Sequence, residues 1–236
     1  MKRLALAAAA ALALVAGTAS AASDRPTLGV TEFTNQSGAA WWQGGVGWEL
    51  ASMLSNELAA TGKFKVVERS QLEAVIEEQN LGASGRVAGG TGAQIGKITG
   101  AEYLVTGTVT AYEENVKGTG GGVSFRGISL GGKSERAYLA VDIRVIDTTT
   151  GEVAFVRTIE GESKGGGVSV GVYRGGWGGT LDNYKNTPTG KAIRAAVVLT
   201  TDYLECVMIK RDGCEAQFDA ADDRRRQRTR ESLDID

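Results

Sequence analysis

The stretch that decides the fold is Glu102–Glu113, EYLVTGTVTAYE, together with Ala137–Asp147, AYLAVDIRVID, which follows it after a glycine-rich interval. The second segment alternates apolar with polar residues, the apolar positions being Leu139, Val141, Ile143 and Val145. An alternation with a period of two predicts a half-buried β-strand. The TTTG sequence at Thr148–Gly151 predicts a turn into a further strand, Glu152–Glu160, so these segments are expected to form a β-meander.

The residues before this meander predict alternating strands and helices. A first strand, Thr27–Phe33, is followed by a loop rich in small and polar residues, Thr34–Gly47. Apolar residues then recur at helical spacing as far as Gly62, at Val46, Leu50, Leu54 and Leu58. A second strand is expected at Phe64–Glu68. The order strand, helix, strand indicates a compact α/β unit.

Three further helices are predicted. The segment Ser70–Glu73, SQLE, fits a capping box and opens a helix that ends at Gly82, with one apolar face formed by Leu72, Val75 and Ile76. A short helix is expected at Ala93–Ile98. Thr187 and Pro188 supply an N-cap and a first-turn proline for a C-terminal helix whose inward residues are Ile193, Ala196, Val197 and Leu204. The fold class is therefore α/β, written more broadly as α+β, with a three-layer-like arrangement.

Composition excludes several classes of function. The chain has 236 residues, 26 basic against 28 acidic side chains and no histidine. Without histidine, a Ser-His-Asp or Cys-His catalytic set is impossible, and the usual zinc ligand is missing. A formal net charge of -2 provides no basic field for binding nucleic acid. The G-x-S-x-G string at Gly167–Gly171 lacks the histidine that would take the serine proton. We therefore predict that the protein is not an enzyme and has no metal, no cofactor and no nucleic-acid partner.

The termini predict a secreted protein. Lys2 and Arg3 precede an apolar run that ends in small residues, which is the order of a secretory signal peptide, here residues 1–21. A permanent membrane anchor is the alternative interpretation. The central domain is expected at residues 22–216, and the charged residues 217–236 are expected to form a disordered tail. Cys206 and Cys214 either form a disulfide in an oxidising compartment or remain as buried thiols.

Two glycine-rich segments, Gly118–Lys133 and Ser163–Gly179, carry alternating apolar residues and are interpreted as extended β-hairpins, with overall bounds of about 113–138 and 155–177. The candidate membrane-facing residues are Val123, Phe125, Ile128, Leu130, Val168, Val170 and Val172. Such alternation is typical of the lipid-facing strands of a barrel, although a soluble hairpin would look similar. Two hairpins supply only four strands, whereas single-chain bacterial barrels start at about eight. Insertion would therefore require several subunits to share one barrel, whose lumen would serve for transport.

An ordered set of segments resembles the CsgG/HfaB family, the curli-secretion and holdfast-attachment proteins. The segments are FKVVERSQL at 64–72, GAEYLVTG at 100–107, YEENVK at 112–117, GGV at 121–123 and IDTTTGEV at 146–153. The resemblance covers roughly Thr27–Val207. It implies a periplasmic α/β domain whose hairpins join around a homo-oligomeric ring into an outer-membrane barrel. This channel would export unfolded adhesin or amyloid subunits and work with periplasmic accessory factors.

The chain departs from the family pattern at two places. Thr18 follows Val15-Ala16-Gly17 where a lipid-bearing cysteine would stand, so we expect a protein of the periplasm and outer membrane of a Gram-negative bacterium that is not lipidated. The loop that narrows the family's channel is shorter here. As a physical hypothesis, the candidate constriction residues are Trp41, Trp42 and Gln43, with the tryptophans as an apolar girdle. The alternative is that the tryptophan pair packs against the domain or against a neighbouring subunit.

A second function remains open at this point. The rival is a soluble periplasmic binding module of the same family that regulates an envelope assembly partner and forms no pore. Charged residues interrupt the apolar bands of both hairpins, at Arg126, Glu160, Glu162, Lys164 and Arg174. A charge that faces lipid at the bilayer midplane costs roughly 2–4 kcal/mol. These residues must therefore face the lumen or the rims of the barrel, or the hairpins do not insert.

Overall fold

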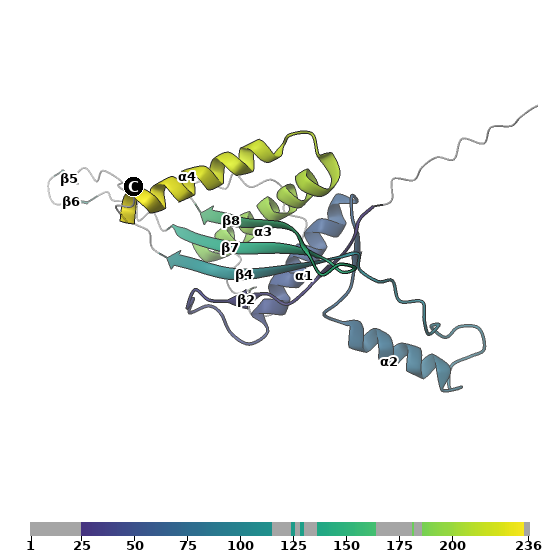
Figure 1. Ribbon diagram of the computed structural model, residues 1–236. Coiled ribbons are helices and arrows are strands. Elements are labelled where there is room, and N and C mark those ends of the chain that lie inside the picture. Colours follow the sequence, from purple (N-terminus) through teal and green to yellow (C-terminus); the bar gives the residue numbers. More distant parts are fainter. Residues whose placement is uncertain are drawn as a thin grey trace, which may run out of the picture.

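The computed structural model describes residues 25–114, 124–125, 128–129, 136–163, 181 and 186–233. Its main element is a six-stranded sheet in the order β3-β1-β4-β7-β8, with β2 paired to β4 (Figure 1). The strands are β1 (Thr27–Val30), β2 (Thr34–Asn35), β3 (Lys65–Val67), β4 (Tyr103–Glu114), β7 (Ala137–Asp147) and β8 (Val153–Ser163). The α/β class expected from the sequence is confirmed.

The strands pair in parallel in one half of the sheet and antiparallel in the other half. The short strands β1, β2 and β3 run parallel to their neighbours, because a helix connects β1 to β3. The three long strands β4, β7 and β8 form an antiparallel meander, in which Gly107 lies opposite Ile143 and Ile143 lies opposite Arg157. This meander agrees with the alternation of Ala137–Asp147, since the residues of β7 that the sequence places inward are buried.

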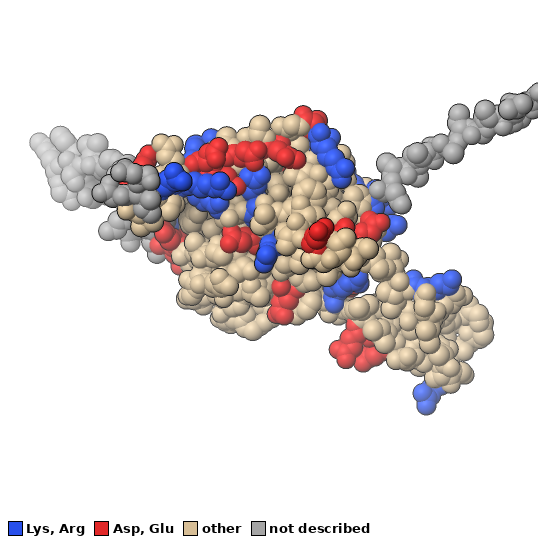
Figure 2. Space-filling model, viewed as in Figure 1, with Lys and Arg blue, Asp and Glu red and all other residues tan. Residues whose placement is uncertain are grey.

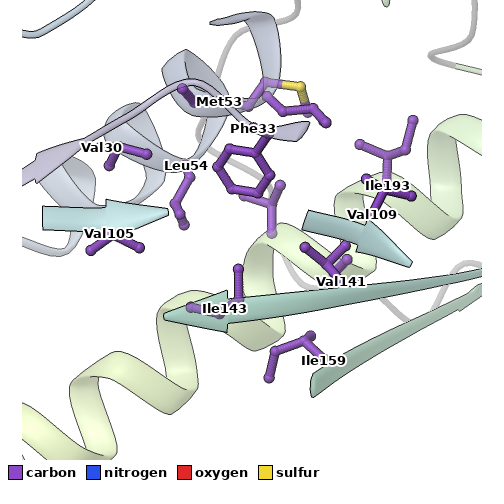
Figure 3. Close-up of a cluster of buried hydrophobic side chains, with 14 of the residues drawn as sticks. Val30, Phe33, Met53, Leu54, Val105, Val109, Val141, Ile143, Ile159 and Ile193 are labelled. Carbon is purple, nitrogen blue, oxygen red and sulfur yellow. The ribbon is translucent and has the colours of Figure 1, made fainter. Parts of the chain in front are cut away.

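Helices α1 (Val46–Thr61) and α3 (Pro188–Glu205) provide the apolar side chains that pack on one face of this sheet. Figure 3 shows Phe33, Leu54 and Ile193 pointing into the same cluster as the strand residues Val109 and Ile143. A short π-helix, Cys206–Lys210, extends α3, and α4 (Glu215–Leu233) then runs back alongside β8 (Figure 1). None of the described helices is both long and apolar enough to span a membrane.

Two glycines let the layers approach closely. A Cβ atom at Gly161 of β8 would collide with the backbone carbonyl oxygen of Ala192 and lie 2.9 Å from the amide nitrogen of Ala196, both in α3. A Cβ atom at Gly107 of β4 would collide with the ring of Phe33. The meander therefore meets α3 at Gly161 and the segment that follows β1 at Gly107, and only glycine leaves enough room at these two positions.

Helix α2 (Leu72–Ala83) starts by a different mechanism from the predicted one. The side chain of Gln71, the residue before the helix, makes no capping hydrogen bond. Instead, the Glu68 carboxylate accepts hydrogen bonds from the amide and hydroxyl of Ser70, both at 2.6 Å, and from the amide of Gln71 at 3.1 Å. The capping box was wrong because Ser70 donates to Glu68 rather than accepting from the helix.

Other boundaries also changed. The strand predicted at Thr27–Phe33 ends at Val30, and the residues predicted as a short helix, 93–98, form turns and irregular backbone. Gly96 has a φ of 78° there, a left-handed conformation that interrupts a helix. The second hairpin was expected to start near residue 155, but residues 155–163 belong to β8 of the main sheet. Ile159, Gly161 and Ser163 are buried on the α3 side, which explains why this stretch stays in the domain.

Residues 217–233, which the sequence analysis assigned to a disordered tail, lie in helix α4. The helix buries no residue completely, so the charge cluster was correctly interpreted as exposed to solvent but not as lacking structure. Its order comes from a few side chains on one face, above all Phe218, which packs against the core. The predicted signal peptide, residues 1–21, lies outside the described residues.

Candidate functional site

The candidate site is the end of the meander from which both glycine-rich segments leave the sheet. Strand β4 ends at Glu114, β7 begins at Ala137 and β8 ends at Ser163. The register places Glu114 opposite Ala137 and Ala137 opposite Ser163, so the three strand ends are immediate neighbours. Both glycine-rich segments therefore leave the sheet at the same end, where the three antiparallel strands terminate side by side.

Hydrogen bonds hold this end of the sheet in register. The Ser163 hydroxyl accepts a hydrogen bond from the Ala137 amide at 2.9 Å, an interaction that is buried. The hydroxyl of Tyr112 on β4 shares a hydrogen bond of 2.8 Å with the hydroxyl of Thr189 in the first turn of α3, which links the strand to the helix. The base from which the two segments extend is thus fixed to the helical layer rather than left to fray.

A polar hollow of about 500 Å³ lies beside these strand ends, between the sheet and α4. The Tyr138 hydroxyl donates to the Glu160 carboxylate at 3.0 Å, and Arg228 of α4 donates to the other oxygen of Glu160 at 3.4 Å. Burial and the neighbouring Glu160 charge raise the pKa of Tyr138 well above its ordinary value. Tyr138 therefore stays protonated and acts as a hydrogen-bond donor, not as an acid or base.

The hollow carries charges of both signs. Its basic and acidic side chains are Arg136, Arg225, Arg228, Glu113, Glu160 and Glu162. Such a mixed lining does not select for a phosphate or another simple anion, because carboxylates compete for the arginines. In the part of the chain that the structure describes, no group of histidine, cysteine, aspartate or glutamate side chains is arranged to hold a metal ion.

The predicted constriction residues are divided by the structure. Trp41 is only 3% exposed and packs edge-on against Tyr112, with ring centroids 5.6 Å apart. Trp42 is partly buried against the same cluster, 5.7 Å from Trp41, whereas Gln43 is exposed. Trp41 therefore follows the packing alternative in this chain. Trp42 and Gln43 remain the candidates that reach the surface.

The predicted hairpin residues fall mostly outside the described residues: Val123, Leu130, Val168, Val170 and Val172 do so. Within the first segment, β5 (Ser124–Phe125) pairs antiparallel with β6 (Ile128–Ser129), and Phe125 lies opposite Ile128. An antiparallel ladder at this point agrees with an extended hairpin in the first segment.

The two cysteines form a disulfide that closes the turn before α4. Cys206 and Cys214 have Cα atoms 5.8 Å apart and are separated by eight positions in the sequence. The structure thus decides between the two alternatives that the sequence left open. The disulfide lies directly before α4, which contains most of the segment that the sequence analysis assigned to a disordered tail.

Sequence reasoning missed the residues by which α4 contacts the domain. Phe218, Ala221, Asp222 and Arg225 all line a hollow between α4 and the sheet. Their spacing of three, four and seven residues places them on one face of a helix, so the signal was present in the sequence. It was obscured because only one of the four is a large apolar residue, and the run of arginines dominates the composition.

Comparison with known proteins identifies the family. The model of the family described as curli production assembly/transport component CsgG matches residues 9–233. The protein of that name from Salmonella typhimurium is 29% identical over 106 residues, which cover 43% of this chain and 38% of the relative. A Neisseria meningitidis protein provisionally named a lipoprotein is 28% identical over 152 residues, covering 64% of this chain and 60% of that protein.

The solved structure of the hypothetical protein CT253 from Chlamydia trachomatis aligns with 79% of this chain and 99% of that chain, at a TM-score of 0.47 and 12% identity. This likeness is too weak to carry an argument, so the assignment rests on the sequence matches. The sequence alignment with the Salmonella curli protein spans only 38% of the length of that relative. Because the family model nevertheless matches almost the whole chain, this protein belongs to the CsgG family of curli production assembly/transport components.

Proposed function

We propose that this chain is a subunit of a homo-oligomeric outer-membrane secretion channel of the curli-assembly type, which exports unfolded adhesin or amyloid subunits. The observation that carries the proposal is the arrangement of the strand ends. Glu114, Ala137 and Ser163 are adjacent, so both glycine-rich segments extend from the same end of one antiparallel sheet. Strands that continue from these adjacent strand ends would already be neighbours in the correct order, as the wall of a shared barrel requires.

The family description supports the coarser part of this proposal. The family is one of assembly or transport components, not an enzyme family. The name of the family refers to curli production, which is the basis for proposing secreted amyloid subunits as cargo. The ring of identical subunits follows from strand number, because two hairpins per chain are too few to close a barrel.

An envelope location is proposed on the same basis. The Neisseria relative is named a lipoprotein, which supports a place at the bacterial envelope. That name also differs from the expectation that this chain is not lipidated. The residues on which the expectation rests, Gly17 and Thr18, lie outside the described residues.

Within the channel, we propose Trp42 and Gln43 as the constriction residues. Trp41, the third residue predicted for this role, is left out because it is buried in the domain.

The second candidate function is a periplasmic binding module that regulates an envelope assembly partner without forming a pore. The observation that favours it is the charged lining beside the strand ends, where Arg136, Glu113 and Glu162 surround the polar hollow. Residues of this kind at the base of the hairpins are costly if they meet lipid and unremarkable at a protein surface in water.

The experiment that separates these functions is a carbonate wash of outer membranes from cells that express the full chain, followed by sizing of the detergent extract. The channel predicts a carbonate-resistant species many times the mass of one chain. The Val170→Asp variant should fail to integrate while its domain stays folded by circular dichroism, because it places a charge on the proposed lipid-facing side of the barrel wall.

The matched control is Gly100→Asp, since Gly100 has open space around it and lies outside both hairpin segments. This variant should integrate like the wild-type chain. Release of the wild-type protein as a monomer with the soluble periplasmic fraction would contradict the channel and favour the binding module. Integration of the Val170→Asp variant would contradict the hairpin assignment.

A further inference from the structure

Helix α2 and the loop that follows it, residues 72–98, form an arm that stands apart from the sheet (Figure 1). The loop returns across the helix at Gly82, where an added Cβ atom would lie 3.1 Å from the backbone nitrogen and oxygen of Ala93. None of the residues of this α2 arm belongs to the hydrophobic core of the described chain. The helix therefore packs against its own loop and leaves its remaining surface open.

The α2 arm exposes many apolar side chains. Ten large apolar side chains are exposed in the described part of the chain, and five of them lie in this arm. Single exposed apolar residues are ordinary, whereas a concentration of them marks an interaction site. The arm therefore has the composition of a contact surface. Its exposed apolar residues, which are between 40% and 64% exposed, are Val75, Ile76, Leu81, Ile95 and Ile98.

The charged residues of helix α2 are all acidic. Glu73, Glu77 and Glu78 are exposed, and the helix contains no lysine or arginine. Glu73 lies three positions before Ile76 and four before Glu77, so these three side chains share one side of the helix. Figure 2 shows the acidic side chains of the arm gathered at one side of a largely uncharged lobe. A surface that covers this helix must therefore combine apolar side chains with positive charge.

The same chain carries such a surface on its sheet. Helices α1 and α3 pack on one face of the sheet, and α4 lies along the β8 edge (Figure 1). On the opposite face, at the end where β4 begins, the register aligns Leu104, Ile146 and Val153 in one row across three strands. In the next row, Arg144 of β7 lies opposite Val156 of β8. Side chains that lie opposite each other share a face, so these five residues form one sheet patch.

The sheet patch is accessible, and its positive charge is unpaired. Val153 is 43% exposed, Val156 is 61% exposed, and Arg144 is exposed as well. In the part of the chain that the structure describes, no salt bridge engages Arg144. The acidic neighbour on this face of β7, Asp142, instead accepts a hydrogen bond from Thr158 at 2.6 Å. The patch therefore matches the α2 arm in both apolar character and charge.

We propose that the α2 arm of one chain docks on the sheet patch of a second copy, with Val75 and Ile76 against the apolar rows and the acidic side of α2 beside Arg144. A second copy is the occupant because one chain carries both complementary surfaces. Since these surfaces differ, the contact is heterologous, and its repetition generates a ring when the rotation between chains closes. The inference rests on the proposed homo-oligomer and names the surfaces that join its subunits.

Two substitutions block the two surfaces separately. Ile76→Asp places a charge within the apolar surface of the arm. Val156→Asp does the same on the sheet patch and adds repulsion from the acidic side of α2. Leu233→Asp is the matched control, because Leu233 is 61% exposed like Val156 but lies at the end of α4. All three side chains are exposed, so circular dichroism of each variant should match that of the wild-type chain.

Analytical ultracentrifugation of the full chain, in detergent where needed, measures the association. Leu233→Asp should form the wild-type oligomer, whereas Ile76→Asp and Val156→Asp should each need at least about ten-fold higher concentration to associate. An equimolar mixture of these two variants should form dimers and nothing larger, because one intact arm then meets one intact patch. A two-fold contact between identical surfaces does not produce this result.

The contrary outcomes are distinct. Wild-type mass for Ile76→Asp or Val156→Asp would overturn the surface that the substitution blocks, and a mixture that stays monomeric would overturn the pairing of arm with patch. A monomeric wild-type chain would overturn the second copy as occupant. Oligomers that follow the expected pattern but are washed from membranes by carbonate would support this contact and contradict the channel alone. The failure of one proposal is therefore distinguishable from the failure of the other.

Discussion

Helices α3 and α4 are neighbours of almost equal length, 18 and 19 residues, yet they are held in opposite ways. Helix α3 buries an entire face against β7 and β8, including Ile193 and Leu204. Helix α4 buries no residue completely and is held by ion pairs, one aromatic ring and a covalent tether. The difference shows that helical structure does not reveal how firmly a segment belongs to a domain.

The physical reason lies in what each helix removes from water. Burial of apolar side chains is the dominant favourable contribution to folding, and α3 exploits it along its whole length. Ion pairs at a surface contribute little, because water and salt weaken the attraction and because holding two long side chains in one geometry costs conformational entropy. We therefore expect α3 to unfold only with the domain, whereas α4 opens locally at a much lower cost in free energy.

The largest effect is expected where α3 meets the sheet. Gly161→Ala places a methyl group against the carbonyl oxygen of Ala192, so α3 and β8 must separate. Overpacking of this kind costs roughly 1–3 kcal/mol, measured as a loss in the free energy of unfolding in denaturant. Gly100→Ala is the control, because nothing lies within 4 Å of a Cβ atom there. Equal stability of the two variants would show that α3 is not tightly packed on β8.

A smaller effect is expected at the start of α3. The Thr187 hydroxyl accepts a hydrogen bond from the Gly190 amide at 3.1 Å and caps the helix. Thr187→Ala should lower the free energy of unfolding by about 1 kcal/mol, and Thr187→Ser should retain most of it. The loss should appear in the global transition, because α3 is part of the cooperative core. A loss confined to local exchange at the first turn would place α3 closer to α4 in behaviour.

For α4, a change of similar chemical size should have almost no global effect. Phe218→Ala removes the edge-on contact with Tyr203, but the helix is expected to open before the domain unfolds. We expect the free energy of global unfolding to fall by less than about 1 kcal/mol. Limited proteolysis, in contrast, should cut within residues 215–233 faster than in the wild-type chain. A large global loss with unchanged proteolysis would contradict the contrast between α3 and α4.

The smallest effect concerns α2, a helix whose apolar side chains Val75 and Ile76 are 40% and 44% exposed. Its start depends on Glu68, whose pKa is lowered from its ordinary value mainly by the hydrogen bond from the Ser70 side chain. Because the folded-state pKa lies below the unfolded one, the stabilisation is present above the unfolded pKa. It is lost as pH falls through the folded pKa.

An NMR titration of the Glu68 carboxyl carbon measures this effect directly. Its midpoint should lie below the ordinary value for glutamate and move upward in the Ser70→Ala variant, because the largest cause of the shift has been removed. The protection of the α2 amides, relative to their intrinsic exchange rates at each pH, should fall in the same acidic range. A midpoint unaffected by Ser70→Ala would show that the backbone amides alone hold the carboxylate.

Much of the fold could be predicted because the relevant pattern was local. The period-two alternation of β7, the stop of α1 at Gly62 and the Thr187-Pro188 start of α3 are encoded within a few residues. The meander and the α/β class followed from these signals. The candidate site was predicted only as two glycine-rich segments, because the adjacency of their bases depends on how β4, β7 and β8 pair.

The features that were missed depend on contacts distant in the sequence. Trp41 could be read as a surface residue or as packing, and its contact with Tyr112 in β4 decides for packing. The order of α4 depends on Arg157 in β8, 62 and 65 positions before its two aspartate partners. Composition alone makes this helix look like a solvated tail, since one aromatic ring among many charges gives little periodic signal.

The sequence by itself determined the period of each strand, the turn between β7 and β8 and the cap of α3, because these follow from the chemistry of adjacent residues. It also excluded histidine-dependent catalysis through composition. Only the tertiary structure decided that the bases of both glycine-rich segments adjoin, that Trp41 is buried, that Cys206 pairs with Cys214 and that α4 covers the β8 edge. The physical reason is that these features arise from side chains and strands that meet only after the chain has folded.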